Sequence, residues 1–216
     1  MQILDILISK QAVETSAFAM AVAGLATFVG CFFVTAPYGR FSTPKGWGVL
    51  IPAKLAWILM ETPNLWVTIV VILYSQFKGQ LRALSSSTNC VLLSMFVFHY
   101  IHRSLIFPLF LQSTKPMPFN VMLLAFLFCT WNGYNQSVTL VAATTYSHTY
   151  MTHTVNFTLG VILFIAGFLI NLSADYRLLY LKRTAAKAEK GVEYVIPTGG
   201  LFDFISCPNY CKCMCV

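Results

Sequence analysis

Two groups of polar residues lie inside apolar stretches of this sequence and are the first candidates for chemistry. Glu61 interrupts the run 50–74, and the segment 99–103 (His-Tyr-Ile-His-Arg) interrupts the run 89–111. A charge near the centre of a bilayer costs roughly 2.5–3.5 kcal/mol on insertion scales, so it persists mainly where it is paired or used. The placement of these residues therefore indicates a buried chemical site.

The surroundings of Glu61 allow two interpretations. Trp57 precedes it by one helical turn on the same face, and Pro63 follows it and would bend a spanning helix. In the first interpretation, Glu61 pairs with a base and holds helices together. In the second, its carboxyl lies in a pocket that has Trp57 as an apolar wall.

The segment 99–103 places Tyr100 and Arg103 on one helical face. Arg103 could extend to the headgroups or bind a phosphate. His99 and His102 are three residues apart and lack a nearby third ligand, so a metal site is not expected. We expect at least one of these histidines to be a structural hydrogen-bonding residue.

Amide and carboxyl groups in two later apolar runs are further candidates. Asn132, Asn135 and Gln136 could join helices or line a pocket. Asn171 and Asp175 lie one turn apart near the expected end of a helix. They could form a polar cap. An acidic side chain there opposes the helix dipole, which favours a ligand such as a ribose hydroxyl or a nicotinamide amide.

The composition defines the elements that must position these residues. The 216-residue chain is 57% hydrophobic and only 10% charged, whereas soluble domains carry about 25% charged residues. A spanning helix needs roughly 20 apolar residues. The sequence therefore predicts an all-α polytopic membrane bundle with spans at about 16–36, 50–74, 89–111, 119–145 and 155–174. A basic helix over 176–193 and an interfacial segment over 194–210 complete a single domain, 1–216.

The Lys and Arg residues outside the spans predict the orientation. One side would hold only Lys10, Lys78 and Arg82, while the other would hold Arg40, Lys45, Lys54, Lys115, Arg177, Lys182, Arg183, Lys187, Lys190 and Lys212. The N-terminus is therefore expected outside or in a lumen and the C-terminus in the cytosol. This bias accounts for the net charge of +7 without a nucleic-acid partner.

The cysteines form two groups. Cys31, Cys90 and Cys129 lie in apolar runs and are interpreted as packing residues. The last four, Cys207, Cys211, Cys213 and Cys215, lack the spacing of a zinc site. Palmitoylation is one alternative for them, and a tail without a role is the other.

Short stretches across nearly the whole chain together resemble the steroid 5α-reductase (3-oxo-5α-steroid 4-dehydrogenase) family. These are Ala36–Arg40, Pro52–Trp57, Met60–Pro63, His99–Arg103, Asn132–Gly133, Ile170–Tyr176 and Tyr194–Phe202. The related trans-2-enoyl-CoA reductases share the C-terminal pattern, including 207–210 (Cys-Pro-Asn-Tyr). The H-Y-x-H-R and E-x-P stretches favour the steroid branch.

The resemblance implies a seven-span fold in the endoplasmic reticulum and NADPH-dependent reduction of a 4-ene-3-oxosteroid. By similarity, Glu61 and Tyr100 would bind the 3-keto oxygen, with Glu61 protonated or sharing the Tyr100 proton, and Trp57 would line the steroid slot. Family positions that hold NADPH correspond to Arg103, Asn171, Asp175, Lys182, Tyr194 and Asn209. Lys182 stands where the animal enzymes have Arg, and so lacks a bidentate fork.

The sequence departs from the family pattern after Tyr210. The family continues with Phe-Gly-Glu-x-x-Glu-Trp and two more spans, whereas residues 211–216 read Cys-Lys-Cys-Met-Cys-Val. We therefore expect a C-terminally truncated form, and for this form we expect loss of activity rather than its retention. Three hypotheses remain: a steroid 5α-reductase, an enoyl-CoA reductase, and an inactive membrane or interaction protein. The preferred steroid and the oligomeric state do not follow from the sequence.

Overall fold

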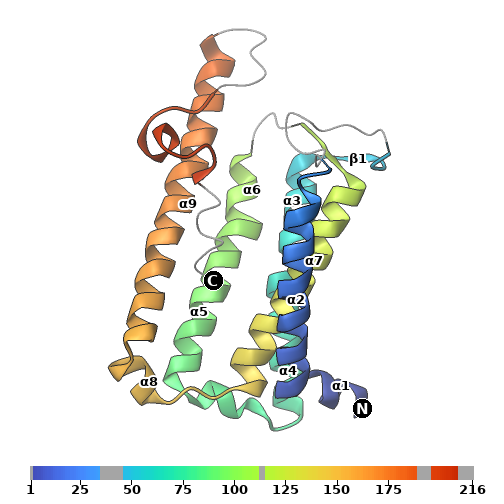
Figure 1. The fold of residues 1–216 in the computed structure, drawn as a ribbon, viewed down its shortest axis with the longest axis vertical. Coiled ribbons are helices and arrows are strands. Elements are labelled where there is room, and N and C mark those ends of the chain that lie inside the picture. The colour runs from blue at the N-terminus through green and yellow to red at the C-terminus, as the bar shows by residue number, and fades with distance from the viewer. Residues whose placement is uncertain (1, 35–45, 112–114, 189–195, 209–216) are drawn as a thin grey trace. The chain divides into compact units, whose positions relative to one another are not determined.

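A computed structural model describes residues 2–34, 46–111, 115–188 and 196–208. The described chain is almost wholly helical (Figure 1). It divides into two compact units, which are described separately. The first comprises Met1–Leu109 and Ser113–His148, and the second comprises Phe110–Gln112 and Thr149–Val216.

The first unit contains most of the helices. Its α-helices are α1 (Gln2–Leu7), α2 (Lys10–Gly30), α3 (Ala53–Glu61), α4 (Pro63–Phe77), α5 (Ser87–Ile101) and α7 (Phe119–Val138). A 3₁₀-helix (Leu81–Ser85) precedes α5, a π-helix (His102–Ile106) joins α5 to α6 (Phe107–Phe110), and a second π-helix (Thr139–Ala143) follows α7. Helix α8 (His148–His153) follows at the junction with the second unit.

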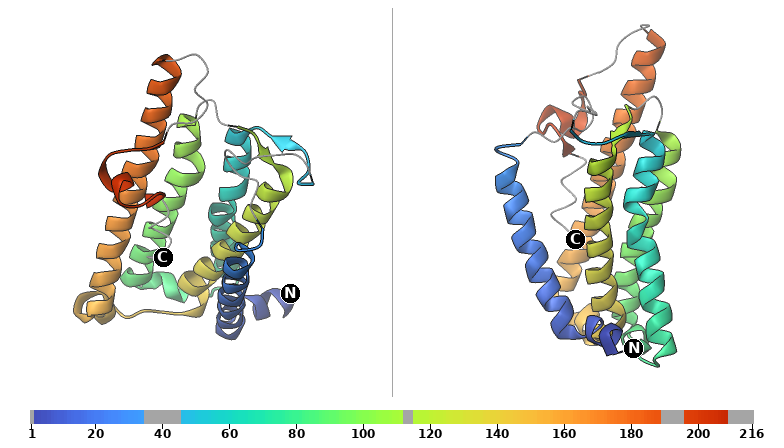
Figure 2. Two further views of the ribbon diagram at one scale, coloured as in Figure 1. Left: turned by 45° about the horizontal axis from the view of Figure 1, so that its top comes forward. Right: turned by 90° about the vertical axis from the view of Figure 1, so that its right-hand side faces the viewer.

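Helix α7 is the central packing element of the first unit. It lies against α2 on one side and against α3 and α4 on the other (Figure 2). A short antiparallel ladder pairs β1 (Leu50–Ile51) with β2 (Met117–Pro118) and fixes the start of α7 beside the start of α3. Val67, Val71 and Val138 are among the buried residues of the core between these helices.

Four stretches of the described chain are long and apolar enough to cross a membrane. They are Lys10–Gly30, Ala53–Phe77, Ser87–Phe110 and Val155–Thr184. These confirm a multi-pass helical membrane protein. The further span expected at 119–145 corresponds to α7, whose 20 residues have the necessary length. Its amide side chains make it too polar to be counted with the other four.

Two prolines determine where the spans deviate from a regular α-helix. Pro63 cannot donate a backbone hydrogen bond, so α3 ends at Glu61 and α4 begins at Pro63, while the Thr62 hydroxyl donates to the Leu59 carbonyl at 3.4 Å. The second proline, Pro108, lies just after the π-helix His102–Ile106. At the end of this π-helix the Phe107 N–H donates to the His102 carbonyl. Both deviations adjoin the polar residues of interest.

The second unit is built on one long helix, α9 (Val155–Ala188), followed by a 3₁₀-helix, Gly200–Asp203. The predicted span at 155–174 and the predicted basic helix at 176–193 form one continuous helix, α9, whose stretch 168–188 contains no proline or glycine. The turn expected at Gly199-Gly200 is present, and both residues have positive φ values, 90° and 63°.

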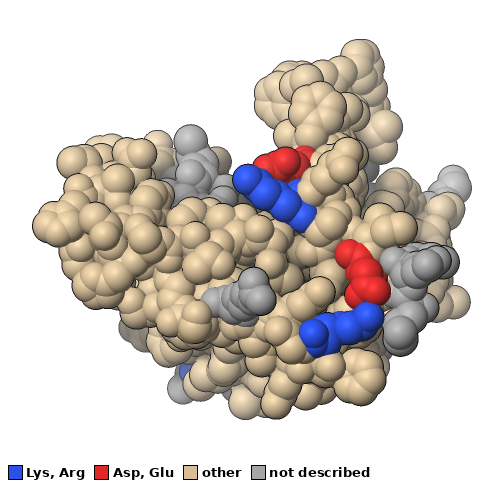
Figure 3. Space-filling view, turned by 90° about the horizontal axis from the view of Figure 1, so that it is seen from below, with Lys and Arg blue, Asp and Glu red and all other residues tan. Residues whose placement is uncertain are grey.

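Charged side chains are sparse on the surface seen from below. The acidic side chains visible there each lie beside a basic one (Figure 3). The described ion pairs of the first unit include Lys10–Glu14 at 3.7 Å and Lys78–Asp5 at 2.9 Å. Such pairing compensates the acidic charges of Glu14 and Asp5.

Candidate active site

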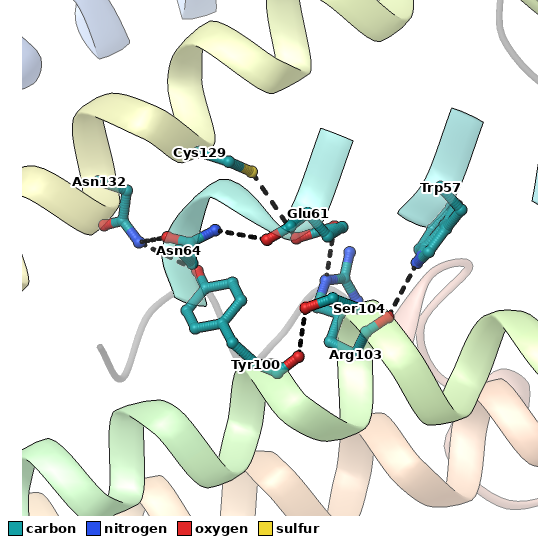
Figure 4. Close-up of polar contacts among 8 residues, drawn as sticks. All are labelled: Trp57, Glu61, Asn64, Tyr100, Arg103, Ser104, Cys129 and Asn132. Carbon is teal, nitrogen blue, oxygen red and sulfur yellow. Dashed lines mark hydrogen bonds and ion pairs between the residues drawn. The ribbon is translucent and has the colours of Figure 1, made fainter. Parts of the chain in front are cut away.

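Polar residues of α3, α4, α5, the π-helix His102–Ile106 and α7 form one connected network in the first unit (Figure 4). Arg103 Nε donates to Glu61 Oε1 at 2.8 Å, and Cys129 Sγ lies 3.7 Å from Glu61 Oε2. The Glu61 side chain is only 8% exposed and that of Arg103 is 21% exposed. This contact matches the interpretation in which Glu61 pairs with a base and holds helices together.

Trp57 packs on the same ion pair. Its indole Nε1 donates to the Arg103 carbonyl at 3.2 Å, and the Arg103 guanidinium carbon lies 5.2 Å from the centre of the Trp57 ring. The Phe107 ring is 5.4 Å from the Trp57 ring. Trp57 was expected beside Glu61. In the structure it also contacts Arg103 directly, through a hydrogen bond and through cation–π attraction.

Two amides connect Glu61 to the Tyr100 hydroxyl. Asn64 Nδ2 donates to the Glu61 carbonyl at 3.3 Å, and Asn132 Nδ2 donates to Asn64 Oδ1 at 2.9 Å. The same Asn132 nitrogen lies 3.0 Å from the Tyr100 hydroxyl oxygen. The two residues expected to bind a substrate oxygen, Glu61 and Tyr100, thus belong to one hydrogen-bonded set (Figure 4).

A close helix crossing brings these amides together. A Cβ added at Gly133 would lie 3.0 Å from the Asn64 Cα and 3.2 Å from the Pro63 carbonyl oxygen. Gly133 therefore allows the backbones of α4 and α7 to approach, as small residues do in membrane bundles. One turn further on, Thr68 and Ser137 share a hydrogen bond of 2.7 Å across the same crossing.

The π-helix places Arg103 and supports Tyr100. The Ser104 hydroxyl donates to the Tyr100 carbonyl, next to the widened turn (Figure 4). Single π-turns inside α-helices occur frequently at functional sites. The widened turn and Pro108 together explain why this span is not a continuous α-helix between 87 and 110.

Some residues of the network do not appear among the site residues predicted from the sequence. Asn64 is fully buried, and it follows Glu61 by three residues, a spacing that could have identified it. Cys129 was interpreted as a packing residue, but its thiol contacts Glu61. The sequence allows Asn132 either to join helices or to line a pocket, and in the structure it contacts both Asn64 and Tyr100.

The remaining predicted site residues belong to the second unit or lie outside the described residues. Asn171 and Asp175 are buried one turn apart on α9, and Lys182 lies two turns further on. Tyr194 and Asn209 fall outside the described residues, as do Cys211, Cys213 and Cys215. Within the described ranges, no group of three or more His, Cys, Asp and Glu could hold a metal ion.

A pocket of about 220 Å³ lies in the second unit beside α9, with Arg177, Gly199 and Gly200 in its lining. The Arg177 side chain donates to the Thr198 carbonyl at 3.1 Å. It occupies the space that a Cβ on Gly199 would need, at 2.7 Å. Arg177 was counted only as a cytosolic charge in the sequence, and the structure adds it to the candidate ligand-binding residues.

The fold and the network define a multi-pass helical membrane protein with a hydrogen-bonded carboxylate, phenol and guanidinium inside its bundle. Comparison with known proteins specifies the family. Residues 115–215 match the family model for 3-oxo-5-alpha-steroid 4-dehydrogenase. The chain is 38% identical over 185 residues to the rat 3-oxo-5-alpha-steroid 4-dehydrogenase 1, an alignment that covers 85% of this chain and 67% of that protein.

Two further relatives extend this similarity to other lineages. The bovine 3-oxo-5-alpha-steroid 4-dehydrogenase 1 is 36% identical, with 91% of this chain and 73% of the relative aligned. The tomato steroid 5-alpha-reductase DET2 is 37% identical, with 89% and 71% aligned. The chain belongs to the 3-oxo-5-alpha-steroid 4-dehydrogenase family.

Proposed function

We propose that this protein reduces the 4,5 double bond of 3-oxo-4-ene steroids to give 5α-3-oxosteroids, with NADPH as reductant. The observation that carries the proposal is the single network that includes Glu61, Tyr100 and Trp57 in a chain of this family. A steroid is apolar except at its ends, so a membrane bundle with one internal cluster of hydrogen-bonding groups suits it. Names of relatives from animals and a plant agree with this substrate class.

In the proposed reaction, Tyr100 donates a hydrogen bond to the 3-keto oxygen of the steroid. As hydride adds to C5, negative charge develops on that oxygen in the enolate, and a preorganised donor stabilises it. A proton from water then adds to C4 and completes the reduction. The Arg103–Glu61 pair has no net charge, so Glu61 can lie close to the developing oxyanion without repelling it as a lone carboxylate would.

The second unit offers a donor set that suits a nicotinamide dinucleotide. The Asn171 amide and the Asp175 carboxylate are buried and suit ribose hydroxyls or a carboxamide. Arg177 and Lys182 suit phosphates, and Gly199 leaves room for the Arg177 guanidinium. When bound, NADPH supplies the hydride. We assign its binding to these residues together with Arg103, Tyr194 and Asn209.

We also propose that the protein is in the endoplasmic reticulum membrane, with a lumenal N-terminus and a cytosolic C-terminus. The excess of Lys and Arg assigned to one side supports the orientation, and the family resemblance supports the endoplasmic reticulum. Glycosylation acceptor sites introduced near Lys10 and near Lys187 test this orientation. Modification at the first site alone is expected, and modification near Lys187 alone would reverse the assignment.

The experiment that tests the proposed function is steroid reduction in membranes that contain the 216-residue chain. The membranes receive a 4-ene-3-oxosteroid and NADPH, and the 5α product is measured by mass spectrometry. Parallel reactions contain NADH, a trans-2-enoyl-CoA, or the variant Tyr100→Phe. A 5α-steroid product that requires both NADPH and Tyr100 supports the proposal. Reduction of the enoyl-CoA alone, or of neither substrate, would overturn it.

A further inference from the structure

A chain of hydrogen bonds runs from the Glu61 backbone carbonyl through Asn64 and Asn132 to the Tyr100 hydroxyl. The carbonyl can only accept, and this determines which group donates in each bond of the chain. The Glu61 backbone carbonyl has no proton, so Asn64 must turn its NH₂ group toward it, at 3.3 Å. This leaves the Asn64 carbonyl oxygen facing Asn132, which must present its own NH₂ group at 2.9 Å. If either amide were turned over, two donors or two acceptors would face each other.

The same argument extends to the phenol. The Asn132 NH₂ group that meets Asn64 also lies 3.0 Å from the Tyr100 oxygen. An amide N–H can only donate, so the Tyr100 oxygen accepts on this side. The phenol proton must then point away from Asn132. A phenol that accepts one hydrogen bond is also polarised to donate a stronger one.

We propose that Asn132, oriented by Asn64, is a positioning residue that commits the Tyr100 hydroxyl to donate toward the substrate ketone. This inference rests on the proposed function and adds to it a determinant of preference for 3-oxo steroids. Asn64 is fully buried, and Gly133 allows the two helices to approach closely at this point. The amide pair is thereby held at a fixed distance from both Glu61 and Tyr100.

The substitution Asn132→Asp tests the inference because it keeps the shape and removes the donor. An aspartate at this position would accept the Tyr100 proton and turn it away from the substrate. The expected result is a loss of affinity of about tenfold for a 4-ene-3-oxosteroid, the effect of one hydrogen bond. The affinity for the matching 3-deoxy steroid should not change, because that ligand has no ketone to bind.

The measurement is binding of the two radiolabelled steroids to the purified full chain in detergent, together with kcat and KM for the 3-oxo steroid. Asn135→Asp is the matched control, since Asn135 lies on the same helix and is 7% exposed, with Nδ2 at 3.7 Å from Met20 Sδ. This control should retain the preference for the 3-oxo ligand. If Asn132→Asp does not fold, Asn132→Ala provides the same comparison with a smaller neutral residue that has no side-chain donor.

Each outcome decides the matter. A selective loss for the 3-oxo ligand in the residue-132 variant supports the inference. Equal losses for both steroids would indicate a purely structural role and overturn it, as would unchanged affinities. If the unsubstituted protein neither binds nor reduces the 3-oxo steroid, the proposed function fails, and the inference fails with it. This result differs from the others because it appears in the protein without any substitution.

Discussion

Glu61 and Arg103 are 42 residues apart in the sequence, yet their side chains meet at 2.8 Å inside the helical bundle. Each of the two residues lies in a stretch that is long and apolar enough to cross a membrane. A charge in such a position is costly when alone, and a partner offsets that cost. The two interpretations of Glu61, as a residue that holds helices together and as an active-site carboxyl, are therefore compatible. Arg103 joins the helices and also compensates the charge of the candidate active-site carboxylate.

The first prediction concerns the stability of this pair. Arg103→Met should lower the free energy of unfolding by about 3 kcal/mol, because it leaves a buried carboxylate without its partner. Glu61→Gln should cost less, since the arginine side chain is more exposed, 21% against 8%. Thermal unfolding of both variants in detergent provides the measurement. Equal stability of the two variants would contradict the asymmetry.

The second prediction concerns catalysis. Tyr100→Phe should lower steroid turnover by about 10²- to 10³-fold, the usual effect of removing one oxyanion donor. Tyr134→Phe is the control, because it removes a hydroxyl that donates instead to the Leu7 carbonyl at 2.6 Å. Initial rates of both variants, normalised to folded protein, give the comparison. Comparable rates in the two variants would argue against the role of Tyr100.

The third prediction concerns the approach of α4 and α7. Gly133→Ala should lower the free energy of unfolding by about 1–3 kcal/mol, as overpacking does, because its Cβ would lie 3.0 Å from the Asn64 Cα. Gly24→Ala adds the same methyl group to α2 where no atom lies within 4 Å. Melting temperatures of the pair measure the difference. A similar shift in both would mean that the close crossing is not required.

The fourth prediction concerns pH and the surface pair Asp5–Lys78. The hydrogen bond from Lys78 lowers the pKa of Asp5 below 3.8, and the hydrogen bond to Asp5 raises the pKa of Lys78 above 10.5. The contribution of Asp5 to stability is therefore complete above pH 3.8 and is lost as the pH falls through its lowered pKa. That of Lys78 is complete below pH 10.5 and is lost as the pH rises through its raised pKa.

The measurement for this fourth prediction is the melting temperature across the acid and alkaline ranges, compared with Asp5→Asn. In the substituted protein, the melting temperature should change less with pH in both ranges, because the contribution of the pair is absent. A variant whose profile matches the original at both extremes would show that the pair does not contribute in solution.

The membrane class, the candidate spans and half of the residues labelled in Figure 4 could be predicted from the sequence. Glu61, Tyr100 and Arg103 were identifiable because polar side chains in apolar runs are costly and hence few. Trp57 followed from helical spacing. The break at Pro63 could be expected because proline lacks a donor, and the structure ends α3 there.

The partners within the network could not be predicted from the sequence. Which base meets Glu61 depends on how α3 and α5 are paired, and no local pattern specifies that pairing. The π-helix at His102–Ile106 changes which residues share a face, so simple i, i+3 spacing is unreliable there. The Asn64–Asn132 contact depends on the crossing at Gly133, which a glycine in an apolar run indicates only weakly.

The separation between Glu61 and Arg103 also bears on how the protein is made. A ribosome delivers Glu61 to the membrane before it has synthesised Arg103, 42 residues later. For that interval the carboxyl lacks the guanidinium that it meets in the folded bundle. Substitutions at Arg103 are therefore expected to lower the yield of membrane-integrated protein, and not only its catalytic rate.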